Sequence, residues 1–196
     1  MTKSEVLEKC KQILEKYNLK TPYFFSISSL NPRKNFRHTI KCFIDFIEKN
    51  NLTDVSLVLA GPDGWGELFD GINLEKHKKQ IIFTGFVDEE DLPYLYKNAI
   101  ASIYLSLYEG FGLPPLESIK TGTPVIASNV SSIPEVVPAE CGGLLINPKD
   151  ENALICMLQK LYFDENFRQE ISIKGVEYAK TYTWEKFAQV LKKEFE

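Results

Sequence analysis

Short apolar runs alternate with amphipathic stretches along most of the chain. Apolar runs of strand length predict six β-strands, while apolar positions spaced three and four residues apart predict helices between them. The expected strands cover residues 23–29, 55–60, 81–84, 100–107, 125–128 and 143–146. The expected helices cover residues 1–20, 35–50, 88–98, with Asp88 as a helix cap, and 114–120, and three more lie within 150–196.

This alternation predicts one domain over residues 1–196, with an α/β fold built on a doubly wound parallel sheet. Continuous apolar strands separated by helices are typical of a parallel sheet that is covered on both faces. Ligands of such sheets bind in the crevice beyond the carboxyl ends of the strands. The loops that follow the strands are therefore where binding residues are expected.

The loop after the first predicted strand carries two adjacent cations. It reads Ser-Leu-Asn-Pro-Arg-Lys-Asn from Ser29 to Asn35, and it contains neither a Gly-x-Gly-x-x-Gly nor a Gly-Lys-Ser/Thr motif. Arg33 and Lys34 at the start of a helix suit an anion such as a diphosphate. The alternative is that both are solvated charges in a turn.

The loop after the fourth predicted strand holds two glutamates around a glycine turn. Its residues run from Tyr108 through Glu109, Gly110, Phe111, Gly112, Leu113 and two prolines to Glu117. Glycines allow a backbone to approach a ligand closely, and a carboxylate can accept hydrogen bonds from two sugar hydroxyls. We therefore predict a ligand with phosphate at its centre and hydroxyl-rich sugar around it. The alternative is a tight turn in which Glu117 only favours the helix dipole.

Composition narrows the class of protein further. The net charge is −4 and the isoelectric point about 5.4, which argues against a nucleic-acid binder. No apolar run reaches the roughly 18 residues that span a bilayer. Cys10, Cys42, Cys141 and Cys156 lack metal-ligand or disulfide spacing, so we expect free, mostly buried thiols in a cytoplasmic protein.

Metal binding is not expected. His38 and His77 are the two histidines, and we expect both on helix surfaces without a partner. Residues 88–91 form an acidic cluster, which we interpret as the start of a helix in preference to a metal site.

Several motifs occur in the order typical of one enzyme family. They are Asn31-Pro32-Arg33-Lys34-Asn35, Leu59-Ala60-Gly61-Pro62, Phe83-Thr84-Gly85-Phe86-Val87, the Glu109 to Glu117 segment, Gly122 to Ser128, Pro134 to Val137 and Gly142 to Leu145. From Tyr23 to Trp184 the sequence resembles the donor-binding half of retaining glycosyltransferases of the GT-B class, the glycosyl transferases group 1 family. The fold implied is Rossmann-like, as the C-terminal half of a GT-B enzyme with extra C-terminal helices.

The resemblance implies roles for individual residues. Glu117 would hold the ribose of a nucleotide sugar, and Glu109, as a catalytic residue, a hydroxyl of the transferred sugar. Arg33 and Lys34, with backbone amides near Phe111 to Leu113, would stabilise the leaving diphosphate in place of a metal or other cofactor. Gly61, Pro62, Phe86 and Val87 would face the base, and Gly110 and Gly112 would shape the donor loop.

The same resemblance implies the reaction and the partners. We expect transfer of a hexose, from GDP-mannose or a UDP-sugar, to a glycan or lipid-linked acceptor, because the Pro-Arg-Lys-Asn variant resembles a subgroup that includes mannosyltransferases. The acceptor would bind a separate N-terminal domain, so we expect residues 1–196 to be inactive alone. Residues 183–196 would cross back to the N-terminal domain. The full-length enzyme would associate peripherally with membranes. The alternatives are a non-catalytic donor-binding subunit of a split transferase and a GT-B-fold sugar-nucleotide epimerase.

Overall fold

Six parallel strands form a single sheet in the computed structural model, which describes residues 2–62, 71–139 and 142–195. The strands are β1 (Tyr23–Ile27), β2 (Ser56–Ala60), β3 (Ile81–Gly85), β4 (Ala101–Tyr104), β5 (Val125–Ser128) and β6 (Gly143–Ile146). The α-helices are α1 (Lys3–Lys16), α2 (Phe36–Lys49), α3 (Leu92–Asn98), α4 (Leu113–Lys120), α5 (Ile133–Val136), α6 (Glu151–Phe163), α7 (Glu165–Ala179) and α8 (Trp184–Phe195). Two 3₁₀ turns, η1 (Pro32–Lys34) and η2 (Leu74–His77), lie in the connections. The predicted doubly wound α/β fold is confirmed.

The order of the strands creates a crevice at the middle of the sheet. The order is β3-β2-β1-β4-β5-β6, so the chain moves outward in one direction from β1 and in the other from β4. The loops that leave the carboxyl ends of β1 and β4 therefore diverge, and this is the switch point at which open α/β sheets bind ligands. The two loops singled out in the sequence are these two loops.

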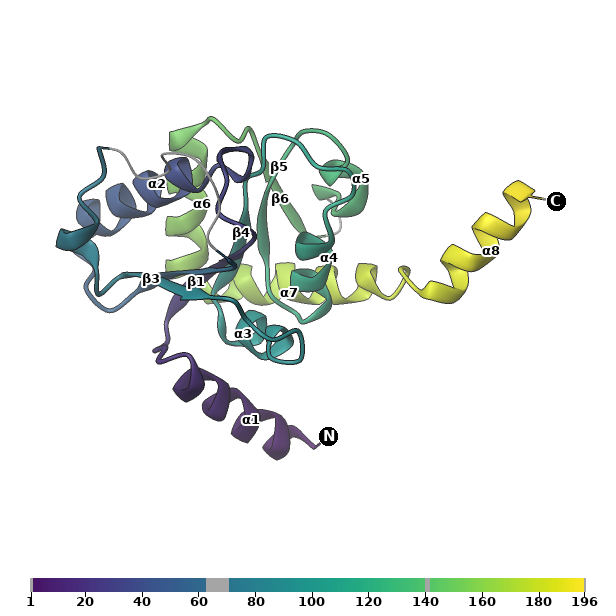
Figure 1. The fold of residues 1–196 in the computed structure, drawn as a ribbon, viewed down its shortest axis with the longest axis horizontal. Helices are drawn as coiled ribbons and strands as arrows, with labels where there is room; N and C mark the ends of the chain where they lie inside the picture. The colour runs from purple at the N-terminus through teal and green to yellow at the C-terminus, as the bar shows by residue number, and fades with distance from the viewer. Residues whose placement is uncertain (1, 63–70, 140–141, 196) are drawn as a thin grey trace.

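Hydrophobic clusters cover both faces of the sheet. Phe24 of β1 faces α2 and α6, where Ile40, Phe43 and Leu158 pack. The neighbouring Phe25 faces the opposite side, toward α1 and α3. Successive strand residues point to opposite faces, and Figure 1 shows helices on both sides of the sheet. The strands consequently read as continuous apolar runs.

The two terminal helices differ in how they join this core. α1 begins at a capping box formed by Thr2 and Glu5, and it packs beside α3. α8 extends away from the sheet and its helices (Figure 1). Its residues Phe187, Leu191 and Phe195 are all at least partly exposed, while the side chain of Trp184 lies outside the described part.

The predicted elements were close to the observed ones, with three differences. The strand expected at 100–107 ends at Tyr104, and the short α5 was not predicted. The helix expected to start at Asp88 starts at Leu92, with Asp91 before it. The reason is that Asp88 and Asp91 both bind Lys16 of α1, at 2.7 and 2.6 Å, and Asp91 also accepts from Tyr17. The two carboxylates thus bind a side chain of α1, and the start of α3 has no side-chain cap.

The expectation that both histidines lie on helix surfaces without a partner was wrong, whereas that of free, mostly buried thiols agrees with the described cysteines. His77 is buried, and its Nε2 lies 3.5 Å from Glu48, whereas His38 is half-buried. Cys10 and Cys42 are buried as expected, but Cys156 is exposed on α6. Cys141 lies outside the described residues. The sequence pattern placed these residues on helices without showing which side of each faces the core.

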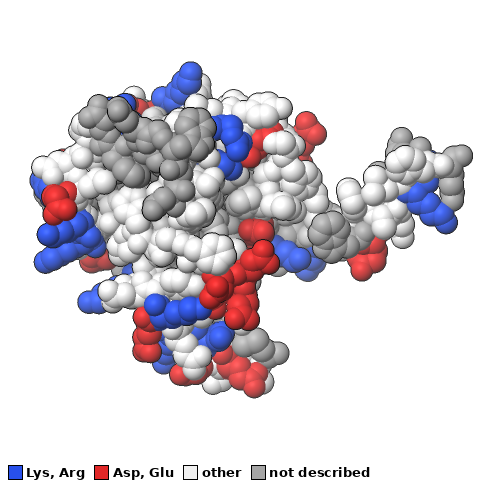
Figure 2. Space-filling view, viewed as in Figure 1, with Lys and Arg blue, Asp and Glu red and all other residues white. Residues whose placement is uncertain are grey.

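The described surface bears charges of both signs. Figure 2 shows acidic and basic side chains interspersed over the face in view, notably around α1 and α3. Within residues 2–62, 71–139 and 142–195 there is no helix long and apolar enough to cross a membrane. The same ranges contain no cluster of three or more His, Cys, Asp or Glu residues arranged to hold a metal.

Candidate functional site

The loop after β1 turns sharply so that its two cations face the sheet's switch point. η1 covers Pro32–Lys34, and Asn35 then adopts a left-handed conformation, with φ of 59°, before α2 begins. The carbonyl of Arg33 accepts a hydrogen bond from the amide of Leu107, at 2.9 Å. Backbone bonding therefore ties this loop directly to the loop that follows β4.

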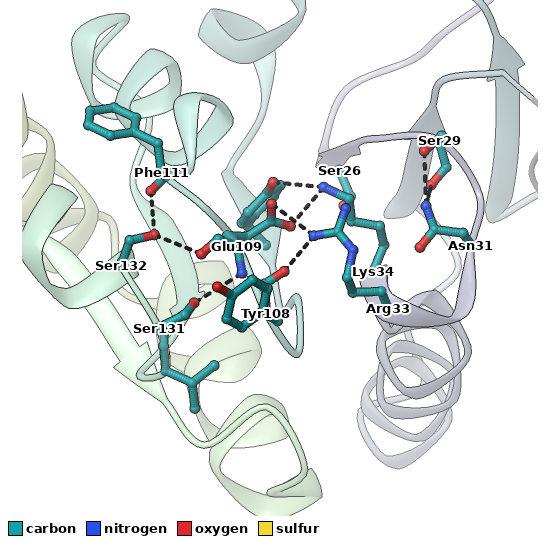
Figure 3. A network of polar contacts seen from close by, with 12 residues as sticks. Ser26, Ser29, Asn31, Arg33, Lys34, Tyr108, Glu109, Phe111, Ser131 and Ser132 are labelled. Carbon is teal, nitrogen blue, oxygen red and sulfur yellow. Dashed lines mark hydrogen bonds and ion pairs between the residues drawn. The ribbon is translucent and has the colours of Figure 1, made fainter.

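Glu109 lies between the two cations. Its Oε1 is 2.7 Å from Lys34 Nζ and its Oε2 is 3.1 Å from Arg33 Nη1 (Figure 3). The side chains of Lys34 and Glu109 are only 11% and 10% exposed, whereas that of Arg33 is 46% exposed. The three charges predicted to form one site are therefore in direct contact, although 75 residues separate Lys34 from Glu109.

The environment keeps Glu109 ionised. Burial by itself would raise the pKa of this carboxyl, but hydrogen bonds from Lys34 and Ser106 and the positive charge of Lys34 outweigh burial and lower it. The backbone is held as well, because its amide donates to Ser131 Oγ at 3.1 Å and its carbonyl accepts from Ser132 Oγ at 3.2 Å. The carboxylate is thus fixed in position and in charge.

The glycine turn that follows has one glycine with a steric requirement and one without. Gly112 has φ of +100°, and a Cβ there would lie 2.4 Å from Ile133 Cδ1. Gly110 has no atom within 4 Å of an added Cβ. Conformation therefore demands glycine at 112, while at 110 glycine leaves open space at the mouth of the site.

The start of α4 offers few backbone donors. Two of its first three residues are proline, and proline has no N–H. Pro114 and Pro115 therefore remove two of the four N–H groups that an ordinary helix start leaves free. Arg33 and Lys34 consequently account for most of the positive charge that faces the crevice.

Glu117 lies in the second turn of α4. Its Oε2 accepts a hydrogen bond from the buried hydroxyl of Tyr96, at 3.3 Å. Glu117 is exposed to solvent. The protein packed beside its carboxyl nevertheless desolvates it in part and raises its pKa, and the nearby negative charge of Glu89 acts in the same direction.

A small gap in the packing, without room for a ligand, lies among residues near the two glutamates. Its walls are Ile27 of β1, three β4 residues from Ser102 to Tyr104, Tyr96 of α3 and Pro114 of α4. Tyr104 contacts the Glu109 end through Lys34, at 3.0 Å, and Tyr96 contacts Glu117. Glu109 is thus linked to the residues around this gap through Lys34 and Tyr104, and Glu117 is linked to them through Tyr96.

The remaining predicted site residues differ in their exposure and in their contact with the β1 loop. Gly61 packs against the β1 loop so closely that a Cβ would lie 2.1 Å from Ser28 O, and Pro62 O accepts from Leu30 N. Phe86 is exposed, whereas the Val87 side chain is buried with the core of α1 and α3. Val87 can therefore offer a ligand its backbone but not its side chain.

Apolar groups form the exposed rim of the turn. Phe111 and Leu113 are exposed, and the Phe111 ring lies 6.4 Å from that of Tyr182, at the end of the α7 region. Tyr108 is also exposed, and its carbonyl accepts from the Arg33 guanidinium. These residues give the crevice an apolar border beside its charged centre.

Sequence reasoning missed the residues that support the charged ones. Tyr96, Tyr104, Ser131 and Ser132 all hydrogen-bond to predicted site residues or their backbone. A signal was available for Tyr104, a hydroxyl-bearing residue near the end of an apolar strand that leads into the site. Tyr96 and the serines lie on other elements, so their proximity depends on the fold.

Comparison with known proteins places this site in a family. The model of the family described as "Glycosyl transferases group 1" matches residues 11–178. O-antigen chain mannosyltransferase B of Escherichia coli is 35% identical over 179 residues, which are 90% of this chain and 46% of that protein. The chain thus spans less than half the length of that curated relative.

Solved structures agree with the sequence comparison. The C-terminal domain of a glycosyl transferase group 1 family protein from Francisella tularensis superposes with a TM-score of 0.74 at 26% identity, covering 87% of this chain and 90% of that one. Sucrose-phosphate synthase from Thermosynechococcus elongatus gives a TM-score of 0.78 at 26% identity, covering 94% of this chain but 49% of that one. The match covers most of the known structure where that structure is itself a C-terminal domain. The six-stranded sheet, the crevice at its switch point and these matches together show that the chain belongs to the glycosyl transferases group 1 family, as a C-terminal, donor-binding domain of GT-B fold.

Proposed function

We propose that this domain binds a nucleotide-sugar donor for retaining, metal-independent transfer of a hexose to a glycan or lipid-linked acceptor. The observation that carries the proposal is the contact of Arg33 and Lys34 with Glu109 at the switch point of the sheet. It puts two anion-binding groups and a hydroxyl-binding group within one ligand's length.

Each end of the crevice suits one part of the donor. The cations of Arg33 and Lys34 match the diphosphate, because guanidinium and ammonium groups form charge-assisted hydrogen bonds with phosphate oxygens. Glu117, on α4, suits the ribose hydroxyls. Glu109 suits a hydroxyl of the transferred sugar, and the exposed Phe86, with Gly61, Pro62 and the Val87 backbone, suits the base.

The electrostatics suit departure of the diphosphate. Sugar transfer develops positive charge on the sugar and negative charge on the leaving phosphate. Arg33 and Lys34 would stabilise that negative charge, and each preorganised donor of this kind is worth ~2.7–4 kcal/mol of transition-state stabilisation. Glu109, kept ionised by the low pKa described above, would lie near the developing positive charge on the sugar.

The donor we favour is GDP-mannose, with UDP-sugars as the second class. Mannosyltransferase is the name of the E. coli relative with 35% identity, and of several further relatives with 29% identity. The acceptor would bind a preceding domain, so we expect residues 1–196 alone to bind donor without transferring sugar. The proposed domain includes the leading helix at residues 1–20 and the C-terminal helix at 183–196.

Calorimetric titration with GDP, UDP and their sugar conjugates tests the proposal. We expect Arg33→Ala and Glu117→Ala to weaken binding about 10- to 100-fold, the effect of losing a charge-assisted hydrogen bond. Arg37→Ala, which changes an exposed arginine at the second position of α2, is the matched control and should bind as the wild type does. Equal affinity of all four proteins for every ligand would refute the assigned site.

A further inference from the structure

Two buried tyrosine hydroxyls lie at the carboxyl edge of the sheet, each beside one glutamate of the crevice. Tyr104 ends β4 and is 6% exposed, and Tyr96 lies on α3 and is 1% exposed. Both residues line the same small packing gap, together with Pro114 of α4. A buried hydroxyl without a partner is costly, so what each hydroxyl bonds to shows what it does.

The Tyr104 hydroxyl helps to orient the Lys34 ammonium. It accepts a hydrogen bond from Lys34 Nζ at 3.0 Å, and the same Nζ lies 5.1 Å from the centre of the Tyr104 ring. A second N–H of the ammonium donates a hydrogen bond to Glu109 Oε1, at 2.7 Å. An ammonium has three protons, so these two contacts fix its orientation and leave one N–H for an anion.

Tyr104 is also linked to Glu109. A hydrogen bond to this carboxylate and the nearby negative charge, together with burial, raise the pKa of the Tyr104 hydroxyl. The hydroxyl therefore keeps its proton and can donate to the carboxylate while it accepts from Lys34. Lys34 thus contacts both Tyr104 and Glu109, and Figure 3 shows the polar contacts around Lys34 and Glu109.

Tyr96 has the corresponding place at the other glutamate. Its hydroxyl donates to Glu117 Oε2 at 3.3 Å. Its ring meets Phe25 edge-on at 5.1 Å, and its carbonyl accepts from Thr123 Oγ1 at 2.7 Å, so the donor is held rigidly. Because Tyr96 engages Oε2, the other oxygen of Glu117 remains to accept from a ligand hydroxyl.

Packing alone does not account for these hydroxyls. Phenylalanine would fill the same volume at either position without burying an oxygen. The hydroxyls instead bond to a charged side chain of the crevice in each case, and hydrogen bonds to charged groups are the stronger ones.

We propose that Tyr104 and Tyr96 are positioning residues for opposite ends of the donor, Tyr104 setting Lys34 and Glu109 at the diphosphate and Tyr96 setting Glu117 at the ribose. This inference rests on the proposed function and assigns each end of the crevice its own buried support. It requires that loss of one hydroxyl affect one chemical part of the nucleotide and spare the other.

Tyr104→Phe and Tyr96→Phe test this separation by calorimetry on the 196-residue chain. The ligands are a nucleoside diphosphate, the matching monophosphate and the 2′,3′-dideoxy diphosphate, with guanine or uracil according to which diphosphate the wild type binds more tightly. In the wild type we expect the diphosphate to bind more tightly than the monophosphate. For Tyr104→Phe this ratio of affinities should fall about fivefold to tenfold, while the ratio between the ribose and the dideoxyribose diphosphate stays unchanged. For Tyr96→Phe we expect the reverse, so each variant is the control for the other.

Tyr23→Phe controls for loss of any buried tyrosine hydroxyl. Tyr23 is fully buried and donates to Leu95 O at 2.6 Å, but it begins β1, at the opposite end of the strand from the site. It should change thermal stability without changing either affinity ratio. If both site variants weaken all three ligands equally, or leave both ratios at wild-type values, the positioning roles are overturned while the proposed function stands. If the wild type binds no nucleoside diphosphate, the proposed function is overturned and this inference with it.

Discussion

The ion pair between Lys34 and Glu109 should contribute measurably to the stability of the fold, and the pair between Arg33 and Glu109 should not. We consider Glu109→Gln, Lys34→Met and Arg33→Met and the two double variants with Glu109→Gln. These changes remove charge while keeping most of each side chain's length and volume. Double-mutant cycles then isolate each pair from the other contacts of its members.

The magnitudes follow from exposure. Removing one partner of a fully buried ion pair costs about 3–5 kcal/mol, and an exposed pair contributes about 0.2–1 kcal/mol. Lys34 and Glu109 are 11% and 10% exposed at a separation of 2.7 Å, but Lys34 keeps the Tyr104 hydroxyl as a partner. We therefore expect a coupling energy of about 2 kcal/mol for this pair. Arg33 is 46% exposed, so we expect about 0.5 kcal/mol for its pair with Glu109.

Urea unfolding at neutral pH, followed by circular dichroism, measures these energies. Glu109→Gln should also lower the melting temperature by about 4–8 °C, since 1 kcal/mol corresponds to about 2–4 °C in a chain of this size. Coupling below about 0.5 kcal/mol for Lys34 and Glu109, or equal coupling for the two pairs, would refute the reasoning from burial.

The stabilising effect of the Glu109 carboxylate should also depend on pH. The pKa of Glu109 is lowered in the folded protein relative to its ordinary value of 4.5. A group with a depressed folded pKa binds fewer protons in the folded state, so its stabilisation is complete above the unfolded pKa and is lost as the pH falls through the folded one. The stability difference between wild type and Glu109→Gln should thus be largest above pH 4.5 and shrink at lower pH. A difference that stays constant down to acid unfolding would contradict this assignment.

Four further variants test the backbone and the α1 contact by thermal melting. Gly112→Ala should destabilise the protein by about 2 kcal/mol, because residue 112 has a left-handed backbone and contacts α5. Gly110→Ala adds its methyl group in open space, so its stability should stay within about 0.5 kcal/mol of wild type. Equal effects of the two substitutions would contradict the steric argument. Gly61→Ala should cost more than 3 kcal/mol or prevent folding, on the order of the largest single-residue effects, because its Cβ would overlap the carbonyl of Ser28; a wild-type melting temperature would be incompatible with this packing. Asp91→Asn should destabilise by about 2 kcal/mol at neutral pH. Hydrogen bonds from α1 outweigh burial and lower the pKa of Asp91, so the difference from wild type should disappear as the pH falls below 3.8, and its persistence in acid would argue against an ionised Asp91.

Local sequence patterns located most elements because parallel strands and covering helices require particular residue spacings. The strands at Val125–Ser128 and Gly143–Ile146 were predicted to the residue, since each is a short run closed by turn residues. The start of α3 was wrong because an acidic cluster resembles a helix cap, while in the fold two of its carboxylates bind Lys16 of another helix. Long-range ion pairs of this kind leave no trace in a local window.

The candidate site, too, could be predicted only in part from local sequence. The sequence by itself determined which residue types follow β1 and β4, because the crevice of a doubly wound sheet draws its residues from the loops after the strands. Only the tertiary structure decided that Lys34 contacts Glu109 at 2.7 Å, that Val87 faces the core and that Tyr96 supports Glu117. The reason is physical: spacing along the chain sets which side of an element a residue occupies, whereas contacts between elements depend on how the sheet twists and how the helices pack against it.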